Sequence, residues 1–147
     1  MPTLALNKRV RYDYDLLEEL EGGLVLTGAE VKSVKAGHAQ LKGAFLHIRS
    51  GELWLKGAFI AKYAPAGKQE SYNASRDRKV LVHRRELSRL IGKVQSDRLT
   101  LVPISVYTRG NLVKLGFALG RGKRQYEKRE TIKKRDVERQ LREKMKE

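Results

Sequence analysis

The chain has 147 residues, a length that suits one domain with an appendage and is short for two. Hydrophobic residues make up 40% of the sequence, enough for a hydrophobic core, and 32 Lys and Arg against 17 Asp and Glu give a net charge of +15, which favours polyanionic partners. The absence of cysteine excludes disulfides and thiolate metal sites, and no apolar run approaches the roughly 18 residues that a membrane-spanning helix needs.

Charge and apolar content divide the chain near residue 120. Residues 1–120 carry 20 basic and 11 acidic side chains, whereas residues 121–147 carry 12 and 6 in a much shorter piece. We therefore expect a folded body over 1–120 and a basic C-terminal tail over 121–147. The N-terminus lacks the long apolar segment of a secretory signal, so a cytoplasmic location is expected.

Short elements are predicted in the first third of the body. Three leucines of segment 13–21 share one face of a predicted helix, which Gly22-Gly23 would stop. A short strand is predicted over 24–28. A second helix is predicted over 30–36, with Gly37 ending it.

Residues 44–63 give the clearest β signal. Leu46 and Ile48 alternate with polar residues, and the strand residues flank a turn at Ser50-Gly51. Gly57 indicates a bulge or bend in the second arm.

A second hairpin is predicted over 100–120, with its turn around Arg109-Gly110. Pro103 indicates an edge or a bulge in the first arm. The residues predicted to share one face of that arm are Thr100, Val102, Ile104 and Val106.

Between the hairpins, a polar loop over 64–79 precedes a short strand over 80–82 and an amphipathic helix over 83–94. Together these elements predict a mainly β fold with short α-helices, arranged as a small closed or partly open antiparallel barrel. Small barrels of this kind often bind oligonucleotides.

No catalytic motif or metal-binding spacing is recognisable. His38, His47 and His83 form no zinc-like pattern, so no metal, no cofactor and no enzymatic activity are predicted. An alternative is a nuclease in which His47 and His83 act as general acid and base. Nothing in the sequence brings the two together, and surface histidines are the favoured interpretation.

Four basic clusters carry the functional signal: residues 7–11, Lys32 with Lys35, residues 76–79, and the tail. A single cluster is more often a solvated face, but four on one small body favour contacts with a phosphate backbone that weaken steeply with salt. Neighbouring tyrosines could stack on unpaired bases. Membrane binding fits less well, because the tail offers only a narrow apolar stripe.

The tail can form a helix but has little to bury. Ordering the 26 residues of 122–147 costs roughly 26–50 kcal/mol of backbone entropy. Burying three or four apolar side chains returns only about 1.5–3 kcal/mol each. We therefore expect the tail to be disordered when free and helical inside a polyanionic partner.

Five segments, in order, resemble the SmpB family, the tmRNA-binding (SsrA-binding) proteins of bacterial trans-translation. They run from about Leu6 to Asp136 and read LALNKRVRYDY, LEGGLVLTGAEVKSVKAG, SRDRKVLVHRREL, LTLVPISVY and ALGRGKRQYEKRETIKKRD.

The resemblance implies an OB-like antiparallel β-barrel with peripheral helices and a non-enzymatic role. The body would bind the tRNA-like domain of tmRNA and help to deliver it to a stalled 70S ribosome. The tail would then enter the empty mRNA channel near the decoding centre and license tagging and release. The implied partners are tmRNA, the 16S rRNA of the small subunit and, indirectly, EF-Tu-GTP and alanyl-tRNA synthetase; we expect a monomer without a membrane partner.

The resemblance places Asn7, Lys8, Glu21, Leu81 and His83 on RNA-facing positions. Glu21 can serve only as an acceptor for a base amine or a 2′-hydroxyl, because phosphate would repel it, and Leu81 could equally belong to the core. Charge alone adds phosphate contacts at Arg9, Lys32, Lys35, Arg78 and Lys79.

In the tail, the resemblance predicts contacts with the decoding centre and the mRNA channel. Gly122, Lys123 and Arg124 match a flexible basic hinge. Lys128 and Arg129 match a basic segment in which Glu127 replaces the family's aspartate. Tyr126 is expected to stack on an exposed base. The predicted tail contacts also include Lys133, Lys134 and Arg135.

A structural ribosomal protein is a second interpretation, since a basic body with a basic extension is also typical of that class. It predicts one copy in every ribosome, whereas a rescue factor is substoichiometric.

Overall fold

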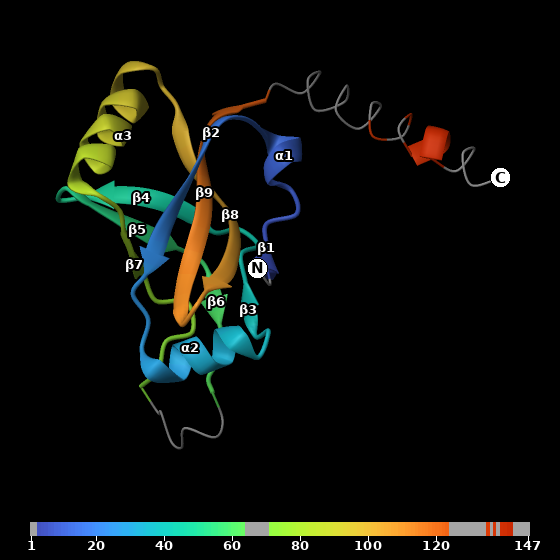
Figure 1. The fold of residues 1–147 in the computed structure, drawn as a ribbon. Helices are drawn as coiled ribbons and strands as arrows, with labels where there is room; N and C mark the ends of the chain where they lie inside the picture. Colours follow the sequence, from blue (N-terminus) through green and yellow to red (C-terminus); the bar gives the residue numbers. More distant parts are fainter. Residues whose placement is uncertain (1–2, 64–70, 124–134, 136, 138, 143–147) are drawn as a thin grey trace.

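Strands dominate the computed structural model, which describes residues 3–63, 71–123, 135, 137 and 139–142 (Figure 1). In chain order the elements are β1 (Thr3–Leu6), α1 (Val10–Asp13), β2 (Tyr14–Leu24), α2 (Gly28–Lys35), β3 (Ala39–Gln40), β4 (Phe45–Arg49), β5 (Glu52–Lys56), β6 (Phe59–Ile60), β7 (Arg78–Leu81), α3 (Arg84–Ser96), β8 (Thr100–Arg109) and β9 (Leu112–Gly122). The predicted fold class, mainly β with short helices, is confirmed.

Seven strands form one antiparallel sheet in the order β1-β8-β9-β2-β7-β5-β4, and β3 pairs with β6 in a small second sheet. The large sheet curls, because β4 at one edge also contacts β8, which neighbours the other edge strand. Helices α1, α2 and α3 lie at the periphery of this curled sheet (Figure 1). The antiparallel, barrel-like arrangement expected from the sequence is therefore present.

The main hydrophobic core lies within the curl of the sheet. It joins strands β5, β7, β8 and β9 to the inner faces of α2 and α3, through residues such as Leu55, Val34 and Leu90. A smaller cluster of Val10, Val102 and Ala118 lies where α1 contacts β8 and β9. Both faces of the β8–β9 hairpin are thus buried.

A β-bulge between Pro103 and Ser105 reverses the faces of β8. Val102 and Ile104 belong to the small cluster, whereas Val106 belongs to the main core. The prediction that Val106 shares a face with Val102 and Ile104 is therefore wrong, because the extra residue changes the alternation. The irregularity expected at Pro103 is confirmed.

The predicted helix over 13–21 is wrong, because this segment is most of the long strand β2. Strand β2 pairs with β9 along most of its length and with β7 near its end. Its outer side is tied to α3 by Glu18, whose carboxylate accepts two hydrogen bonds from Arg89, of 2.7 and 2.8 Å. The predicted strand over 24–28 is also corrected, since only Leu24 of that segment belongs to β2.

The turn expected at Ser50-Gly51 is confirmed, and the structure adds a helix cap that was not predicted. Ser50 and Gly51 have φ angles of 52° and 72°, as a tight two-residue hairpin turn requires. In α2, the Thr27 hydroxyl accepts from the Glu30 N–H and the Glu30 carboxylate accepts from the Thr27 N–H, a complete capping box.

The body extends slightly beyond residue 120. Gly122 pairs with Tyr14 at the end of β9, and the Lys123 N–H donates to the Asp13 carbonyl over 2.9 Å. Gly122 thus ends β9 and Lys123 is hydrogen-bonded to the end of α1, so both residues belong to the folded body, which corrects the expectation that they form a flexible hinge. The described tail residues 135, 137 and 139–142 are helical.

Candidate nucleic-acid interface

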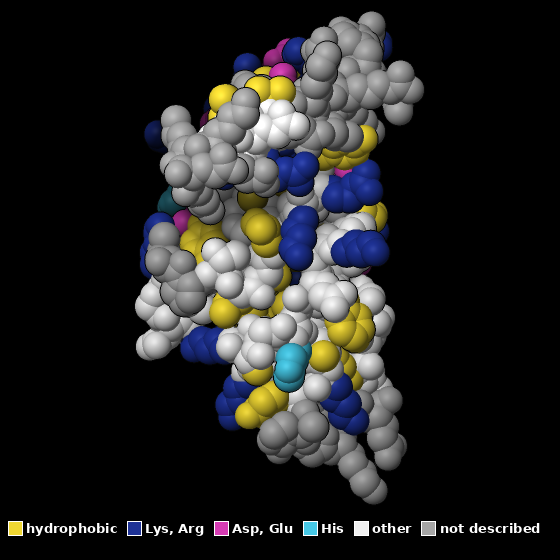
Figure 2. Space-filling view, turned by 90° about the vertical axis from the view of Figure 1, so that its right-hand side faces the viewer, with side chains coloured by type: hydrophobic (Ala, Val, Ile, Leu, Met, Phe, Trp, Pro, Cys, Tyr) yellow, Lys and Arg dark blue, Asp and Glu magenta, His cyan; other side chains and the backbone are white. Residues whose placement is uncertain are grey.

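Two grooves contain six of the ten predicted body residues, and the first of them is the N-terminal groove. It is lined by residues 5–10, 13, 14 and 39–45, which come from β1, α1, the start of β2 and the β3–β4 region. These elements lie on the right-hand side of Figure 1, and Figure 2 shows Lys and Arg side chains gathered on that face beside hydrophobic ones. Asn7, Lys8 and Arg9 all line this groove, so the structure brings these three predicted residues together.

Asn7 is fixed by the backbone of β8. Its N–H donates to the Ile104 carbonyl over 2.7 Å, and its side-chain Nδ2 donates to the Pro103 carbonyl over 2.9 Å. Arg9 stacks on the ring of Tyr12, with its guanidinium carbon 5.0 Å from the ring centroid. The two residues therefore have defined positions at the groove wall, while the Lys8 side chain is exposed.

The second groove, which we call the β2–β7 groove, is lined by residues 21–24, 81–83 and 112–114. It unites Glu21, Leu81 and His83, three of the five residues that the family resemblance placed on RNA. Leu81 is 55% exposed, which answers the question of whether it belongs to the core. The groove also contains Lys114, which the sequence analysis missed because Lys114 stands alone among apolar residues of β9.

Glu21 is engaged at the rim of the β2–β7 groove. Its carboxylate accepts a short hydrogen bond from the Tyr107 hydroxyl and another, of 3.0 Å, from Arg109. Burial and this bond raise the pKa of Tyr107 to about 12, so the hydroxyl keeps its proton and donates at neutral pH. The Glu21 carboxylate is thus held in place, and its charge is partly neutralised by Arg109.

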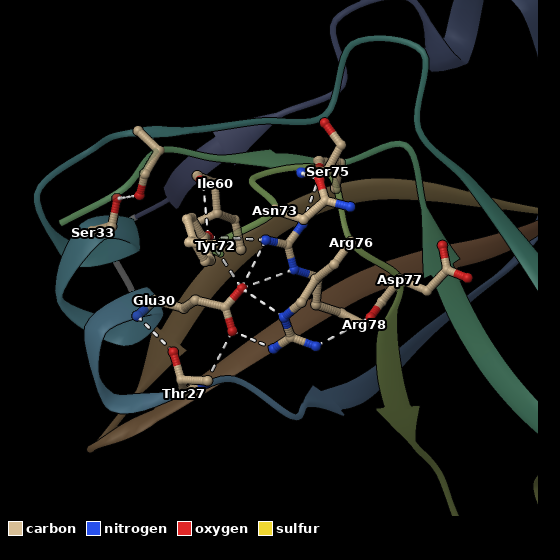
Figure 3. A network of polar contacts seen from close by, with 12 residues as sticks. Thr27, Glu30, Ser33, Ile60, Tyr72, Asn73, Ser75, Arg76, Asp77 and Arg78 are labelled. Atoms are coloured by element: carbon tan, nitrogen blue, oxygen red, sulfur yellow. Dashed lines mark hydrogen bonds and ion pairs between the residues drawn. The ribbon is translucent and has the colours of Figure 1, made fainter. Parts of the chain in front are cut away.

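Arg78 is not on the surface. Its side chain is fully buried and donates to the Glu30 carboxylate, with Nη2 2.7 Å from Oε2, and to the Ala58 carbonyl over 2.7 Å (Figure 3). The expectation that Arg78 clamps a phosphate is corrected, because strand alternation turns it inward. Its neighbour Lys79 points outward and pairs with Glu52 over 3.1 Å.

Glu30 organises this buried network. Burial by itself would raise the pKa of the Glu30 carboxyl, but hydrogen bonds from Arg76, the Thr27 N–H and Arg78 outweigh it and lower the pKa to about 2. The Tyr72 hydroxyl lies in the same network, 2.8 Å from the Ile60 carbonyl (Figure 3). The network ties α2 to β7 and to the segment that precedes β7, which is a structural role and not an RNA contact.

The remaining basic positions are divided between the surface and the undescribed part of the chain. Lys32 and Lys35 are exposed on α2 and line neither groove. Arg135 is exposed in the helical tail segment. The predicted tail residues that lie outside the described part of the chain are Arg124, Tyr126, Lys128, Arg129, Lys133 and Lys134.

The histidines do not form a site. His47 is exposed in the middle of β4, whereas His83 follows β7 as the N-cap of α3, and β5 separates β4 from β7 in the sheet. Among the described residues, no group of three His, Asp or Glu could hold a metal ion. The same part of the chain contains no helix long and apolar enough to cross a membrane.

The fold and the two grooves define a small, basic, mainly β domain of a class that commonly binds oligonucleotides. Over residues 4–147 the chain matches the family model of the SmpB protein. The chain belongs to the SmpB family.

The similarity covers nearly the whole chain. An SsrA-binding protein of Roseiflexus castenholzii is 44% identical over 138 residues, 94% of this chain and 87% of its own length. An SsrA-binding protein of Coprothermobacter proteolyticus is 42% identical over 143 residues, which are 97% of this chain and 95% of its own length. A solved chain described as "tmRNA-SmpB: a journey to the center of the bacterial ribosome" is 40% identical, with a TM-score of 0.65 over 86% of this chain and 92% of that one. That neighbour agrees with the OB-like fold expected from the sequence.

Proposed function

We propose that this protein binds the tRNA-like domain of tmRNA and takes it to ribosomes stalled on broken messages, acting by binding and without catalysis. The observation that carries the proposal is the β2–β7 groove. Three residues chosen by resemblance, Glu21, Leu81 and His83, come from two strands and a helix cap and line one surface. SsrA-binding relatives match along almost the full chain, which supports the same conclusion.

The body contacts would divide between the two grooves. Glu21, Leu81, His83 and the added Lys114 line one of them, where an exposed apolar side chain, a fixed acceptor and a cation lie side by side. The N-terminal groove adds Asn7, Lys8 and Arg9. Lys79, Lys32 and Lys35 would contribute longer-range attraction to phosphates.

The tail would act after the body has bound. The empty mRNA channel of the small subunit is surrounded by rRNA phosphates, which attract the basic residues of the tail, and ordering there would license tagging and release. Val137 and Leu141 support this division, because they remain about half exposed in the helical segment and so contribute little burial to the body. On this proposal the protein works as a cytoplasmic monomer, with EF-Tu-GTP and alanyl-tRNA synthetase acting on the same RNA.

Separation of the two activities tests the proposal. A chain of residues 1–123, cut after Lys123, whose N–H donates to the Asp13 carbonyl of α1, should bind the tRNA-like domain with nearly the affinity of the full chain. The same truncation should abolish peptide tagging on stalled ribosomes. Loss of tmRNA binding by a truncated chain that still unfolds cooperatively would contradict the assignment of RNA binding to the body.

A further inference from the structure

The N-terminal groove has an apolar lining that the three predicted residues do not explain. Leu6 and Phe45 line it and are 55% and 52% exposed, a high exposure for large apolar side chains. Phe45 begins β4 and Leu6 ends β1, so both are held by strands. Exposed aromatic side chains on rigid strands are the platforms on which single-stranded nucleic acid stacks its bases.

The charge of the groove fits a polyanion. Lys8, Arg9 and Lys42 line it, and Asp13 is the one acidic side chain among its described lining residues. Asp13 lies 3.8 Å from Arg9 across an i, i+4 spacing, which offsets only one of these positive charges. Lys8 and Lys42 are exposed, and neither has an ion-pair partner among the described residues.

Asn7 supplies a fixed acceptor in the same groove. Its Nδ2 is committed to the Pro103 carbonyl over 2.9 Å, so the amide orientation is set. The Oδ1 atom receives no hydrogen bond from any described residue. An amide oxygen held in this way can accept from the exocyclic amine of a base.

We propose that the N-terminal groove binds one unpaired, unstacked nucleotide of the RNA. Its base stacks on Phe45, Oδ1 of Asn7 accepts from the base amine, and Lys8 and Lys42 contact the flanking phosphates. Paired RNA does not fit this description, because A-form duplexes hide the base edges in a deep, narrow groove. The inference rests on the proposed function for the identity of the RNA, tmRNA.

This nucleotide site is distinct from the β2–β7 groove, since the two grooves share no lining residue. It lies where the tail leaves the body. Tyr14 lines the groove and pairs with Gly122, and the carbonyl of Asp13 accepts from the Lys123 N–H. A nucleotide held there would keep the RNA close to the root of the tail.

Dimethyl sulfate probing of full-length tmRNA, together with its affinity for the full chain, tests the inference. Wild-type protein should protect the Watson–Crick edge of at least one unpaired adenine or cytosine. Phe45→Ala should remove the protection of that nucleotide and weaken binding roughly 5- to 100-fold, the usual effect of losing one stacking platform. Phe45→Trp should restore both, and Lys42→Gln should lower the salt dependence of binding.

Matched control variants show whether the effects are specific to this groove or follow from the loss of any exposed aromatic or cationic side chain. Phe59→Ala removes another exposed aromatic side chain, from β6 and outside the groove, and Lys62→Gln removes another exposed cation; both should leave binding unchanged. The inference is overturned if Phe45→Ala keeps the wild-type footprint and affinity, or if Phe59→Ala weakens binding equally. If wild-type protein binds tmRNA no better than duplex RNA, the proposed function fails as well.

Discussion

At the scale of single residues, Glu30 is the carboxylate on which one end of the body depends. It caps α2, and it binds the guanidinium groups of Arg76 and Arg78 with a side chain that is 1% exposed. A buried charge of this kind is tolerated only while its partners are present. Substitutions in this network should therefore affect stability much more than RNA binding.

The first prediction concerns Arg78. Arg78→Met should lower the free energy of unfolding by about 3–5 kcal/mol, because it leaves part of the Glu30 charge buried without its partner. Arg76→Gln should cost less, because the Arg76 side chain is 35% exposed and water can replace part of its contact. Urea denaturation measures the free energy of unfolding of both single variants. The double variant Glu30→Gln with Arg78→Met should recover part of the stability that Arg78→Met loses. Equal effects of the two single variants would contradict the buried network.

The second prediction is a dependence of stability on pH. The pKa of Glu30 falls from 4.5 to about 2 on folding, so its ionised form stabilises the fold above pH 4.5 and that contribution disappears as the pH falls toward 2. The contribution is roughly 3 kcal/mol at neutral pH. Glu30→Gln should be less stable than wild type at pH 7, and the difference should narrow between pH 5 and pH 2 in urea denaturation. A difference that stays constant with pH would contradict this assignment.

Two adjacent basic residues of β7 show how far the sequence alone predicts the role of a single side chain. Arg78 and Lys79 have the same charge and were assigned the same role, yet one is fully buried and the other reaches the surface. The alternation of side chains along β7 determines which of the two is buried. The strand was predicted to begin at residue 80, two residues after its observed start, so the alternation could not be applied to them. The residues chosen by resemblance, such as Leu81, were free of this error because their positions did not depend on the strand boundary.

At the scale of elements, β2 connects the two halves of the large sheet. It pairs with β9 on one side and β7 on the other, and the β2–β7 groove lies along the second junction. Gly22 allows this close approach, since a Cβ there would lie 2.6 Å from Cγ1 of Val80 and 3.1 Å from the Leu81 carbonyl oxygen.

The third prediction compares the two glycines of β2. Gly22→Ala should force β7 away from β2, lower the free energy of unfolding by about 1–3 kcal/mol and weaken RNA binding through Leu81. Gly23→Ala is the matched control, because its Cβ would meet only the Leu81 Cβ, at 3.8 Å. Urea midpoints and affinity for the tRNA-like domain report both effects. If the two variants have the same stability and the same RNA affinity, close packing at Gly22 does not determine the shape of the groove.

The error over 13–21 has a physical origin in this same element. Leucines spaced at 16, 17 and 20 satisfy a helical face, but β9 offers backbone partners along this whole stretch of β2, and that tertiary pairing overrides the local pattern. Gly22-Gly23, predicted as a helix stop, instead lies inside β2 where this strand meets β7. By contrast, the hairpin predicted within 44–63 was confirmed as β4 and β5, because its turn and its alternation are local features.

At the scale of the whole molecule, the net charge of +15 governs association with RNA. The fourth prediction is that the logarithm of the binding constant for tmRNA falls linearly with the logarithm of salt concentration. Lys8→Gln should reduce the steepness of that line by about 0.7–1. Lys62→Gln, at an exposed position outside both grooves, should leave the slope unchanged. Binding that is insensitive to salt would contradict phosphate contacts as the main source of attraction.

The most direct test of the central claim compares two RNAs on the same full-length protein. The affinities for the tRNA-like domain of tmRNA and for a random duplex of equal length are measured at physiological ionic strength. The account predicts that the tRNA-like domain binds at least about tenfold tighter, a difference of roughly 1.4 kcal/mol, because the grooves recognise shape and unpaired bases in addition to charge. Equal affinities for the two RNAs would contradict it.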